Sequence, residues 1–238
     1  VRGDLGESYR SGDSIANELL RRLPATLLLA ATALALAVAA GIPLGVLAAV
    51  NRGTWLDTSC RLLALVGAAV PSYVMAPVLM LFFAVKLGWL PAVGYGSPKN
   101  LLLPALALSF GTMAQLMRLT RASVLDVLGQ DYIRTARAKG LSERSVVWGH
   151  GLKSALLPVV TVLGTSTGFL LGGAVIIESI FGWPGVGQFV IQGISQRDYP
   201  VVQGFVLYMA VAFLLINLAV DVSYRWLDPR LHFGGKFN

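Results

Sequence analysis

Charged residues are scarce in this sequence. Of its 238 residues only 13% are Asp, Glu, Lys or Arg, and 55% are hydrophobic. Soluble domains carry charge on about 25% of their residues, so the composition excludes an ordinary soluble protein. The single cysteine, Cys60, excludes a disulfide framework and a thiolate metal cage. The two histidines, His150 and His232, lie far apart, so we expect surface histidines and no metal site.

Nucleotide-binding motifs are also missing. Lys153-Ser154 follows Leu152, where a phosphate-binding loop requires glycine. Gly185 and Gly187 are not followed by the third glycine of a dinucleotide fingerprint. We therefore expect no enzyme activity and no cofactor bound by this chain. The net charge of +7 could indicate nucleic acid, but the loop bias of membrane proteins accounts for it better, so we expect no nucleic-acid partner.

Five long segments contain no charged residue at all. Each has about 18 residues or more, which is the length that a helix needs to cross roughly 30 Å of hydrocarbon. Because lipid cannot hydrogen-bond the backbone, such segments must be helical. We therefore predict an all-α polytopic membrane helix bundle. The segments are 23–50, 62–85, 100–117, 154–177 and 199–220.

The absence of charge inside these segments also limits the mechanism. Ion-coupled carriers usually need an ionisable group within the membrane, and charged rings line many selective pores. The sequence therefore argues against a proton-driven symporter and against such a pore. Prolines interrupt the segments and are expected to kink the helices. They are Pro43, Pro71, Pro77, Pro104 and Pro158.

Lysine and arginine predict the orientation, because they concentrate in cytoplasmic loops. One set of loops carries Arg52, Arg61, Arg118, Arg121, Arg134, Arg137, Lys139, Arg144, Lys153, Arg225, Arg230 and Lys236, and the opposite set carries only Lys86, Lys99 and Arg197. The richer set is expected in the cytoplasm. Counting back places Val1 outside, so we expect a sixth span upstream of residue 1. The predicted parts are an external polar segment (1–22), a transmembrane domain (23–228) with a cytoplasmic loop (118–153), and a cytoplasmic tail (229–238).

The cytoplasmic loop has the signals of a short helix at 132–139. Asp131 can cap its N-terminus. Arg137 and Lys139 lie in the last turn, where cations complement the helix dipole. Gly140 suits the left-handed position after the helix. Two turns alone are marginal in water, so the helix needs a partner surface.

Ser142 can cap a second helix that runs through Val146 and Val147 toward the fourth span. The loop carries a formal charge of +4, from seven basic and three acidic residues. The pattern is compatible with docking to a soluble partner and equally with an amphipathic loop that lies on anionic lipid.

Glycines recur every fourth residue in two spans. Gly164, Gly168 and Gly172 form a ridge on the fourth span, and Gly41 and Gly45 repeat the spacing in the first. Such ridges let another helix backbone approach closely. The spacing does not decide between a subunit or gate interface and packing within the chain.

A turn rich in aromatic residues and glycines follows the fourth span. We interpret it as an external gate or a contact for a binding protein, and an interfacial aromatic belt is the alternative. Glu178 is expected near the membrane edge, solvated or paired. The candidate residues are Glu178, Phe181, Gly182, Trp183, Pro184 and Gly185.

Specific motifs resemble the inner-membrane permease subunit of dipeptide/oligopeptide ABC importers, a family that also includes nickel and glutathione importers. The run Asp131-Tyr-Ile-Arg-Thr-Ala-Arg-Ala-Lys-Gly-Leu-Ser142 is followed by His150 and Ala155-Leu-Leu-Pro158. The other matching pieces, in order, are Gly3–Ser8, Arg22–Thr26, Gly41–Gly45, Pro71–Tyr73, Leu103–Ala105 and Glu178–Gly187.

The resemblance implies a six-helix type I importer subunit in a bacterial or archaeal cytoplasmic membrane. It implies a second homologous permease, two ATPase subunits that bind ATP and Mg, and an external substrate-binding protein. Transport would proceed by alternating access, with peptides as the expected cargo and nickel or glutathione as alternatives. An ATP-independent channel or facilitator and a lipid-recruiting scaffold are the rivals from other classes.

The resemblance also implies that the loop carries an EAA-type coupling motif which contacts the ATPase. By position, Thr135, Ala136 and Gly140 occupy its small-residue and glycine places, whereas Arg134 stands at its acidic first place. Small residues would allow close approach to a groove wall. The expected coupling residues are Asp131, Arg134, Thr135, Ala136, Arg137, Ala138, Lys139, Gly140 and Leu141.

Overall fold

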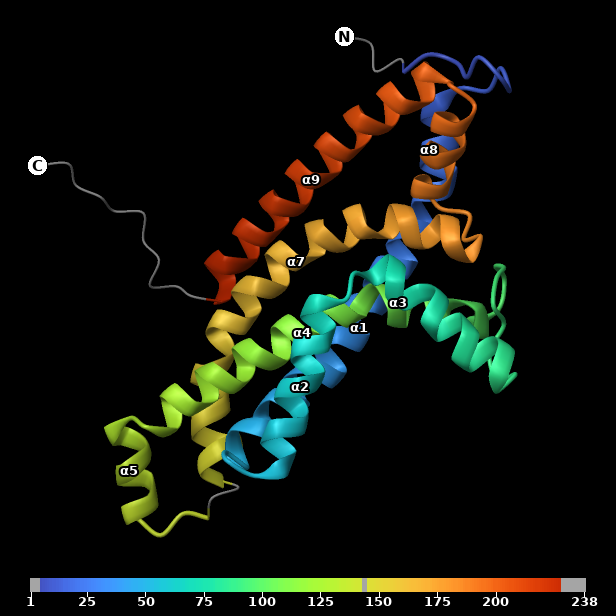
Figure 1. The fold of residues 1–238 in the computed structure, drawn as a ribbon. Helices are drawn as coiled ribbons and strands as arrows, with labels where there is room; N and C mark the ends of the chain where they lie inside the picture. Colours follow the sequence, from blue (N-terminus) through green and yellow to red (C-terminus); the bar gives the residue numbers. More distant parts are fainter. Residues whose placement is uncertain (1–4, 143–144, 228–238) are drawn as a thin grey trace, which may run out of the picture.

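The computed structural model describes residues 5–142 and 145–227. Within these ranges every regular element is a helix, and one isolated β-bridge joins Glu7 to Ser14. The helices form an elongated bundle with α8 at one end and α5 at the other (Figure 1). The prediction of an all-α bundle is confirmed. The predicted tail at 229–238 lies outside the described residues.

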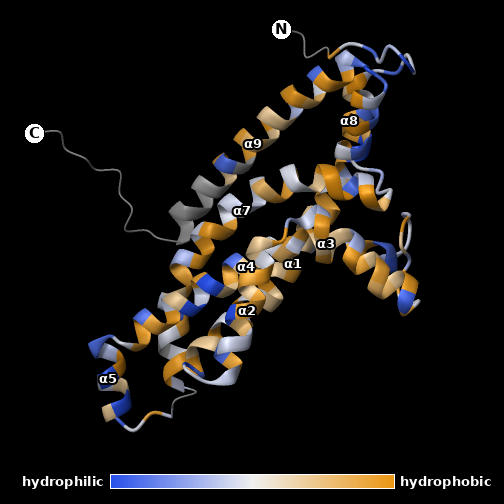
Figure 2. Ribbon diagram, in the orientation of Figure 1, coloured by the Kyte–Doolittle hydropathy of each residue, from blue (hydrophilic) through white to orange (hydrophobic). Residues whose placement is uncertain are grey.

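Apolar residues dominate the long helices, and hydrophilic residues gather on α5 and at the turns (Figure 2). Two of the helices have π-helical turns next to them. In chain order the elements are α1 (Ile15–Val50), α2 (Trp55–Ala69), α3 (Ser72–Leu79) with its π-helical continuation (Met80–Lys86), α4 (Pro98–Leu128), α5 (Asp131–Ala138), a π-helical turn (Val146–Gly151), α7 (Leu152–Phe181), α8 (Val186–Ser195) and α9 (Tyr199–Leu227).

Within the described residues, four helices are long and apolar enough to cross a membrane, namely α1, α4, α7 and the Tyr199–Ala219 part of α9. The second predicted span, 62–85, is not one continuous helix. It consists of α2 and of α3 with its π-helical continuation, which meet at an angle of 110°. Val70 and Pro71 are extended at the break, with ψ angles of 116° and 147°, because proline drives the residue before it out of the helical region.

The first span begins earlier than predicted. α1 starts at Ile15, inside the segment that we expected to be polar and external. Ile15 and Leu19 are fully or almost fully buried, and they cluster with Val186 of α8 and Val201 of α9. The apolar positions in this polar stretch therefore form a small core of their own at the α8 end of the bundle.

The predicted cytoplasmic loop begins later than expected, because α4 continues past Met117 to Leu128. Arg121 is thus a helical residue. Its Nε and Nη2 donate to Oδ1 and Oδ2 of Asp57 on α2, at 2.7 and 2.9 Å. Asp57 is only 2% exposed, and a buried carboxylate requires such a partner. This ion pair extends the contact between α2 and α4 past the end of the uncharged segment 100–117.

The two central helices, α1 and α4, approach each other at backbone distance. A Cβ atom on Gly41 would lie 2.8 Å from the Met113 carbonyl oxygen, and one on Gly45 would lie 2.6 Å from the Met117 carbonyl oxygen. Contacts this short leave no room for any side chain. The glycine pair of the first span therefore serves packing within the chain.

The glycine ridge on α7 is used only in part. Gly168 is buried, and a Cβ atom there would lie 2.7 Å from the Phe213 ring of α9. Gly164 is half-buried, and Gly172 is exposed with nothing within 4 Å of its Cβ position. The ridge was expected to serve either packing within the chain or an interface with another subunit. Gly168 serves packing within the chain, whereas the exposed Gly172 leaves the subunit interface as a prediction.

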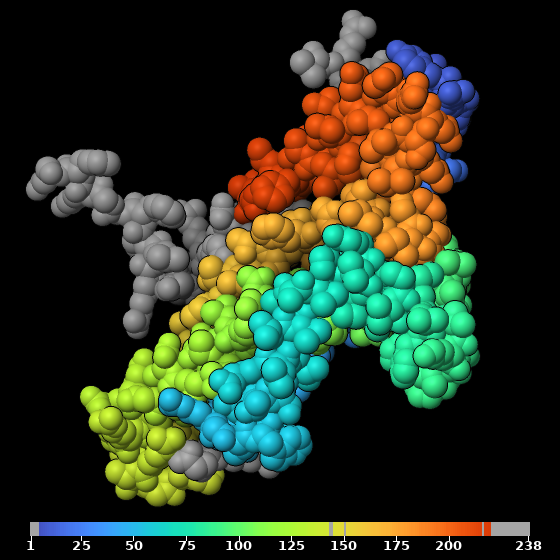
Figure 3. Space-filling model, in the orientation of Figure 1, coloured from blue at the N-terminus to red at the C-terminus, as the bar shows by residue number. Residues whose placement is uncertain are grey.

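The N-terminal segment folds over the loop between α8 and α9, and the two lie side by side in the space-filling view (Figure 3). Ser8 Oγ donates to Asp198 Oδ2 at 2.6 Å, and the Tyr9 amide donates to Oδ1 at 3.3 Å. The Arg10 guanidinium donates to the Gln196 carbonyl oxygen. Burial raises the pKa of the Asp198 carboxyl, but hydrogen bonds from Ser8 and from backbone amides outweigh it, so the pKa lies below its ordinary value.

Replacing Gly45 with alanine should destabilise the bundle. The added methyl group would lie 2.6 Å from the Met117 carbonyl oxygen and 2.7 Å from Thr120 Cβ, and overpacking of this kind costs about 1–3 kcal/mol. Gly111→Ala on α4 is the matched control, because its Cβ would meet nothing closer than 3.8 Å. Thermal unfolding in detergent should show a lower midpoint for Gly45→Ala alone. Equal midpoints for the two variants would contradict the close approach of α1 and α4.

Candidate functional site

Two constellations stand out, one at each end of the bundle. The first is α5, which lies at the tip opposite α8 (Figure 1). It follows α4 after the two-residue turn Gly129-Gln130. Only Ile133 and Ala136 of this helix are buried. They lie one turn apart and form the stripe by which α5 docks onto the rest of the chain.

The docking surface of α5 is an apolar cluster built by four other elements. It receives residues from the ends of α1 and α4 nearest α5, from the π-helical turn Val146–Gly151 and from the start of α7. Its buried members besides Ile133 and Ala136 are Val46, Ala49, Val124, Val127, Val146, Val147 and Ala155. A two-turn helix that is marginal alone is thus held by its own chain. α5 is therefore packed against all four of these elements.

α5 spans Asp131–Ala138, so each end lies one residue earlier than in the predicted helix 132–139, and Lys139 is the C-cap. Gln130 is the N-cap, so the prediction that Asp131 caps the helix is wrong. The Asp131 carboxylate instead accepts from Arg134 at 3.3 Å on the exposed surface. At the other end Gly140 has a φ of +80°, which is the left-handed conformation predicted for it, and its amide donates to the Arg137 carbonyl oxygen.

The exposed face of α5 carries most of the residues predicted to couple this chain to an ATPase. The exposed residues are Asp131, Tyr132, Arg134, Thr135, Arg137, Ala138, Lys139, Gly140 and Leu141. Ala136 is an exception, since it is 8% exposed and contacts the chain's own core. The expectation that Ala136 faces a partner's groove is therefore wrong, because position 136 shares the inward stripe with Ile133.

The segment after α5 returns toward the membrane. Ser142 Oγ accepts from the Ser145 amide at 3.4 Å, and the Val146 amide donates to the Ser142 carbonyl oxygen. This is the capping role that the sequence predicts for Ser142. Residues 143–144 lie outside the described part of the chain. Val146 and Val147 are buried in the same cluster as Ile133, so this return segment forms part of the α5 dock.

The second constellation surrounds Glu178 near the end of α7. Glu178 is completely buried. Its Oε1 accepts from Thr26 Oγ1 of α1 at 2.6 Å, and its Oε2 accepts from the amides of Gly187 and Gln188 at 2.7 and 3.1 Å. The carboxylate thus caps the first turn of α8, where free amides and the helix dipole favour negative charge. Glu178 was expected to be either solvated or paired, and the structure shows it paired with hydrogen-bond donors of the chain.

Glycines shape the turn around Glu178, because at two of them a side chain would not fit and a third has a left-handed backbone. Gly182 ends α7 in the left-handed conformation, with a φ of +60°. A Cβ atom on Gly185 or Gly187 would collide with the Glu178 carboxylate, and the Gly187 one also with Val175 of α7. Pro184 is half-buried in the same turn. The glycines therefore let the amides of α8 reach the carboxylate.

The aromatic residues of this turn are core residues. Phe181 is 1% exposed and Trp183 is 2% exposed, so the interpretation of an interfacial aromatic belt is wrong for both. Trp183 Nε1 donates to the Ala25 carbonyl oxygen of α1 at 2.9 Å, which satisfies the one polar atom of the ring. The indole and Glu178 thus both fasten the turn to neighbouring residues of α1.

Sequence reasoning missed the partner of Glu178. Thr26 Oγ1 donates to the carboxylate and accepts from the Val186 amide at 2.9 Å, so one hydroxyl joins α1, α7 and α8. Thr26 belongs to the matching motif Arg22–Thr26, which was the only signal for it. Nothing in the spacing links position 26 to position 178.

These features can be compared with known proteins. A sequence model of the family described as "Binding-protein-dependent transport system inner membrane component" matches residues 41–233. The glutathione transport system permease protein GsiC of Escherichia coli O6:H1 is 44% identical over 233 residues, which cover 98% of this chain and 76% of that protein. GsiC of Salmonella choleraesuis is 43% identical with the same coverage.

Two solved structures share the fold. The MetNI methionine ABC transporter in an inward-facing conformation matches with a TM-score of 0.75 at 21% identity, over 89% of this chain and 96% of that one. An amino acid ABC transporter with histidines matches with a TM-score of 0.68 at 17% identity, over 88% of this chain and 94% of that one.

The bundle of membrane-length helices has the fold of the membrane subunits of these ABC transporters. The resemblance drawn from the sequence motifs is thereby confirmed. The chain belongs to the family of binding-protein-dependent transport system inner membrane components. It is a multi-pass membrane protein and a transport component.

Glu178→Ala should destabilise the α8 end of the bundle. The substitution leaves the Thr26 hydroxyl and the amides of Gly187 and Gln188 without their acceptor. Hydrogen bonds to a charged group contribute about 1.5–3 kcal/mol each, so we expect a large drop in thermal stability. Hydrogen exchange at Gly187 and Gln188 should also accelerate.

Ser179→Ala is the matched control for this variant. The Ser179 hydroxyl is buried next to Glu178 in sequence and has no hydrogen-bond partner in the described part of the chain, so removing it should leave stability unchanged or slightly raise it. A Glu178→Ala protein that unfolds at the same temperature as Ser179→Ala, with unchanged exchange in α8, would show that the carboxylate does not hold this turn together.

Proposed function

We propose that this chain is the translocation subunit of an ATP-driven importer in which α5 transmits the motion of partner ATPase subunits to the membrane helices. The single observation that supports this role is the form of α5. It is fastened to its own chain by Ile133 and Ala136, and it presents its remaining residues at the tip of the molecule. A surface that projects in this way is suited to a partner.

The dock of α5 supplies the route for that motion. Ile133 and Ala136 share one apolar cluster with Val46 of α1, Val124 of α4 and Ala155 of α7. Well-packed clusters transmit displacement because they have few voids to absorb it. Closure of the ATPases on ATP binding would therefore tilt the three longest helices together. Hydrolysis would reset them, which gives alternating access.

The proposed assembly contains a second homologous permease, two ATPase subunits that bind ATP and Mg, and an external binding protein, in a cytoplasmic membrane. For the second permease, α7 offers an unfilled face. Gly172 is open, and its neighbours Phe169 and Ile176 are 82% and 46% exposed. For the binding protein, the surface of the N-terminal segment and α8 is available. The buried residues Glu178, Phe181 and Trp183 would shape that surface from behind.

We propose glutathione or another short peptide as the cargo. The support is the identity of 43–44% with permeases named for glutathione transport, over 98% of this chain. Nickel is the weaker alternative within the family. The substrate would receive few strong contacts from this chain, since the five segments predicted to cross the membrane contain no charged residue that could bind it.

Ala138→Trp should abolish transport without unfolding the chain. Ala138 lies on the exposed face of α5, so the indole would block a close-fitting ATPase surface and leave the dock of Ile133 and Ala136 intact. The measurements are co-purification of the ATPase subunits and ATP-driven uptake of labelled glutathione into proteoliposomes that contain the complete complex. Both should fall severely.

Arg52→Trp is the control on the same side of the membrane. Arg52 lies exposed in the turn between α1 and α2 and belongs neither to α5 nor to the cluster that holds it, so this variant should retain both the ATPase subunits and uptake. Normal uptake by Ala138→Trp would refute the assignment of α5 as the coupling helix. Uptake by the permease alone without ATP would support an ATP-independent facilitator.

A further inference from the structure

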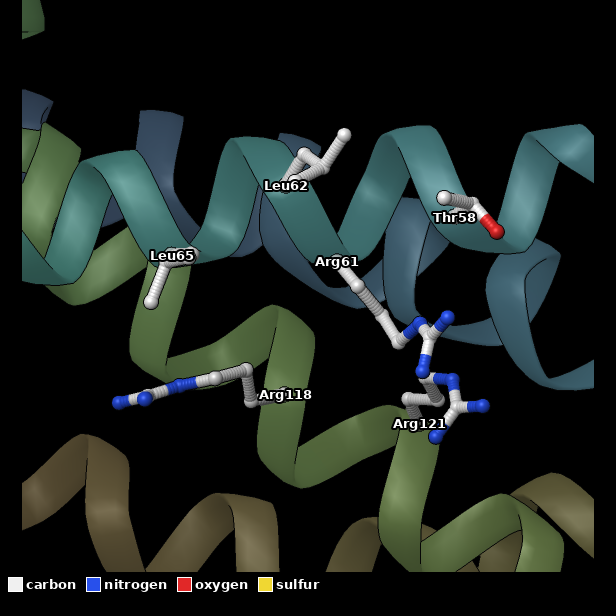
Figure 4. Close-up of a pocket in the computed structure, with 6 residues that line it drawn as sticks. All are labelled: Thr58, Arg61, Leu62, Leu65, Arg118 and Arg121. Carbon is white, nitrogen blue, oxygen red and sulfur yellow. The ribbon is translucent and has the colours of Figure 1, made fainter.

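A basic pocket lies between α2 and α4 at the end of the bundle that carries the turn joining α1 to α2. It has a volume of about 390 Å³. Its lining residues come from α2 and α4 alone and are drawn in Figure 4: Thr58, Arg61, Leu62, Leu65, Arg118 and Arg121. The proposed transport mechanism does not involve this pocket.

The charges around the pocket do not balance. Asp57 is the only acid that pairs with its arginines among residues 5–142 and 145–227, and it gives both oxygens to Arg121 at 2.7 and 2.9 Å. Its contact with Arg61 is longer, at 3.8 Å, and the Arg61 side chain is 58% exposed. Arg118 is exposed as well. Asp57 thus pairs with Arg121 and more loosely with Arg61, and the pocket's three arginines exceed its one carboxylate by two positive charges.

Two of the arginines face each other. The Arg61 and Arg121 guanidinium groups converge, whereas the Arg118 side chain extends from α4 away from them, on the side of Leu65 (Figure 4). Like charges held this close repel each other. An anion placed between them would relieve that repulsion. Arginine is the side chain best suited to a phosphate, because its planar fork donates two parallel hydrogen bonds.

The wall next to the arginines is apolar and uncovered. Leu62 and Leu65 of α2 are 57% and 60% exposed, and Val66 on the same helix is 46% exposed. Trp55, at the start of α2, is 74% exposed, as is typical of a residue at the membrane–water boundary. The pocket therefore has a charged part at headgroup level and an apolar part at the level of the acyl chains.

We propose that this pocket binds an anionic phospholipid of the cytoplasmic leaflet. Its phosphate would lie against the converging Arg61 and Arg121 groups, the Arg118 side chain would turn onto the headgroup, and one acyl chain would lie along Leu62 and Leu65. Basic pockets between membrane helices on the cytoplasmic side are a recognised form of lipid site. The lipid would join α2 to α4 next to the Asp57–Arg121 pair. The proposal rests on the membrane topology and is independent of which solute is transported.

The test uses the complete transporter complex in mild detergent and measures bound lipid by native mass spectrometry. Dioleoylphosphatidylglycerol and dioleoylphosphatidylcholine are the two probes, and inorganic phosphate is the competitor. We expect phosphatidylglycerol to bind and phosphatidylcholine not to. Arg61→Gln combined with Arg118→Gln should weaken phosphatidylglycerol binding by about tenfold to thirtyfold, because each basic residue near the surface contributes to anionic-lipid affinity. Arg121 is kept, since its loss would strand the buried Asp57.

Arg52→Gln is the matched control, because it removes a cytoplasmic-side arginine that does not line the pocket; it should bind phosphatidylglycerol as the wild type does. Equal binding of the two lipids, or equal loss in the control and the double variant, would overturn the proposal. Displacement of the lipid by millimolar phosphate would make the ligand a soluble anion instead. Absence of lipid from the intact complex would mean that another subunit covers the arginines.

Discussion

The close approach of α1 and α4 is the constraint on which the rest of the structure depends. Gly41 and Gly45 put the backbone of α1 against the carbonyl oxygens of Met113 and Met117. In lipid, helices gain little from burying apolar surface against each other, so dense packing of this kind carries the association. The two helices consequently behave as one unit, and every other element is positioned by contact with that unit.

Both functional constellations are fastened to this unit. At one end, Thr26 of α1 holds the Glu178 carboxylate that caps α8, and the Trp183 indole binds the Ala25 carbonyl oxygen. At the other end, Val46 of α1 and Val124 of α4 belong to the cluster that holds α5. α1 therefore contacts both the cluster that holds α5 and the turn at the opposite end of the bundle, and under the proposed mechanism it would carry a displacement of α5 from one to the other.

Much of this organisation could be predicted from the sequence, and what could not has physical reasons. The membrane helices could be predicted from the uncharged segments, and the end of α5 from Gly140, because both depend only on local chemistry. The burial of Ala136, the break at Pro71 and the partner of Glu178 depend on which elements meet in space. No spacing rule brings Thr26 to Glu178, or Arg121 to Asp57. The motif resemblance supplied the family, while the direction in which each residue faces came only from the packing.

The central claim is that α5 moves as one body with the α1–α4 unit. The most direct test is the distance between spin labels at Arg52→Cys, in the turn after α1, and Tyr132→Cys, an exposed position at the start of α5 that is not among the expected coupling residues, in a Cys60→Ser background. The distance distribution should be measured by pulsed electron paramagnetic resonance in the complete complex, without nucleotide and with ATP trapped. The account predicts the same distribution in both states. A shifted or second distance with ATP would mean that α5 hinges on its dock, and it would contradict the account.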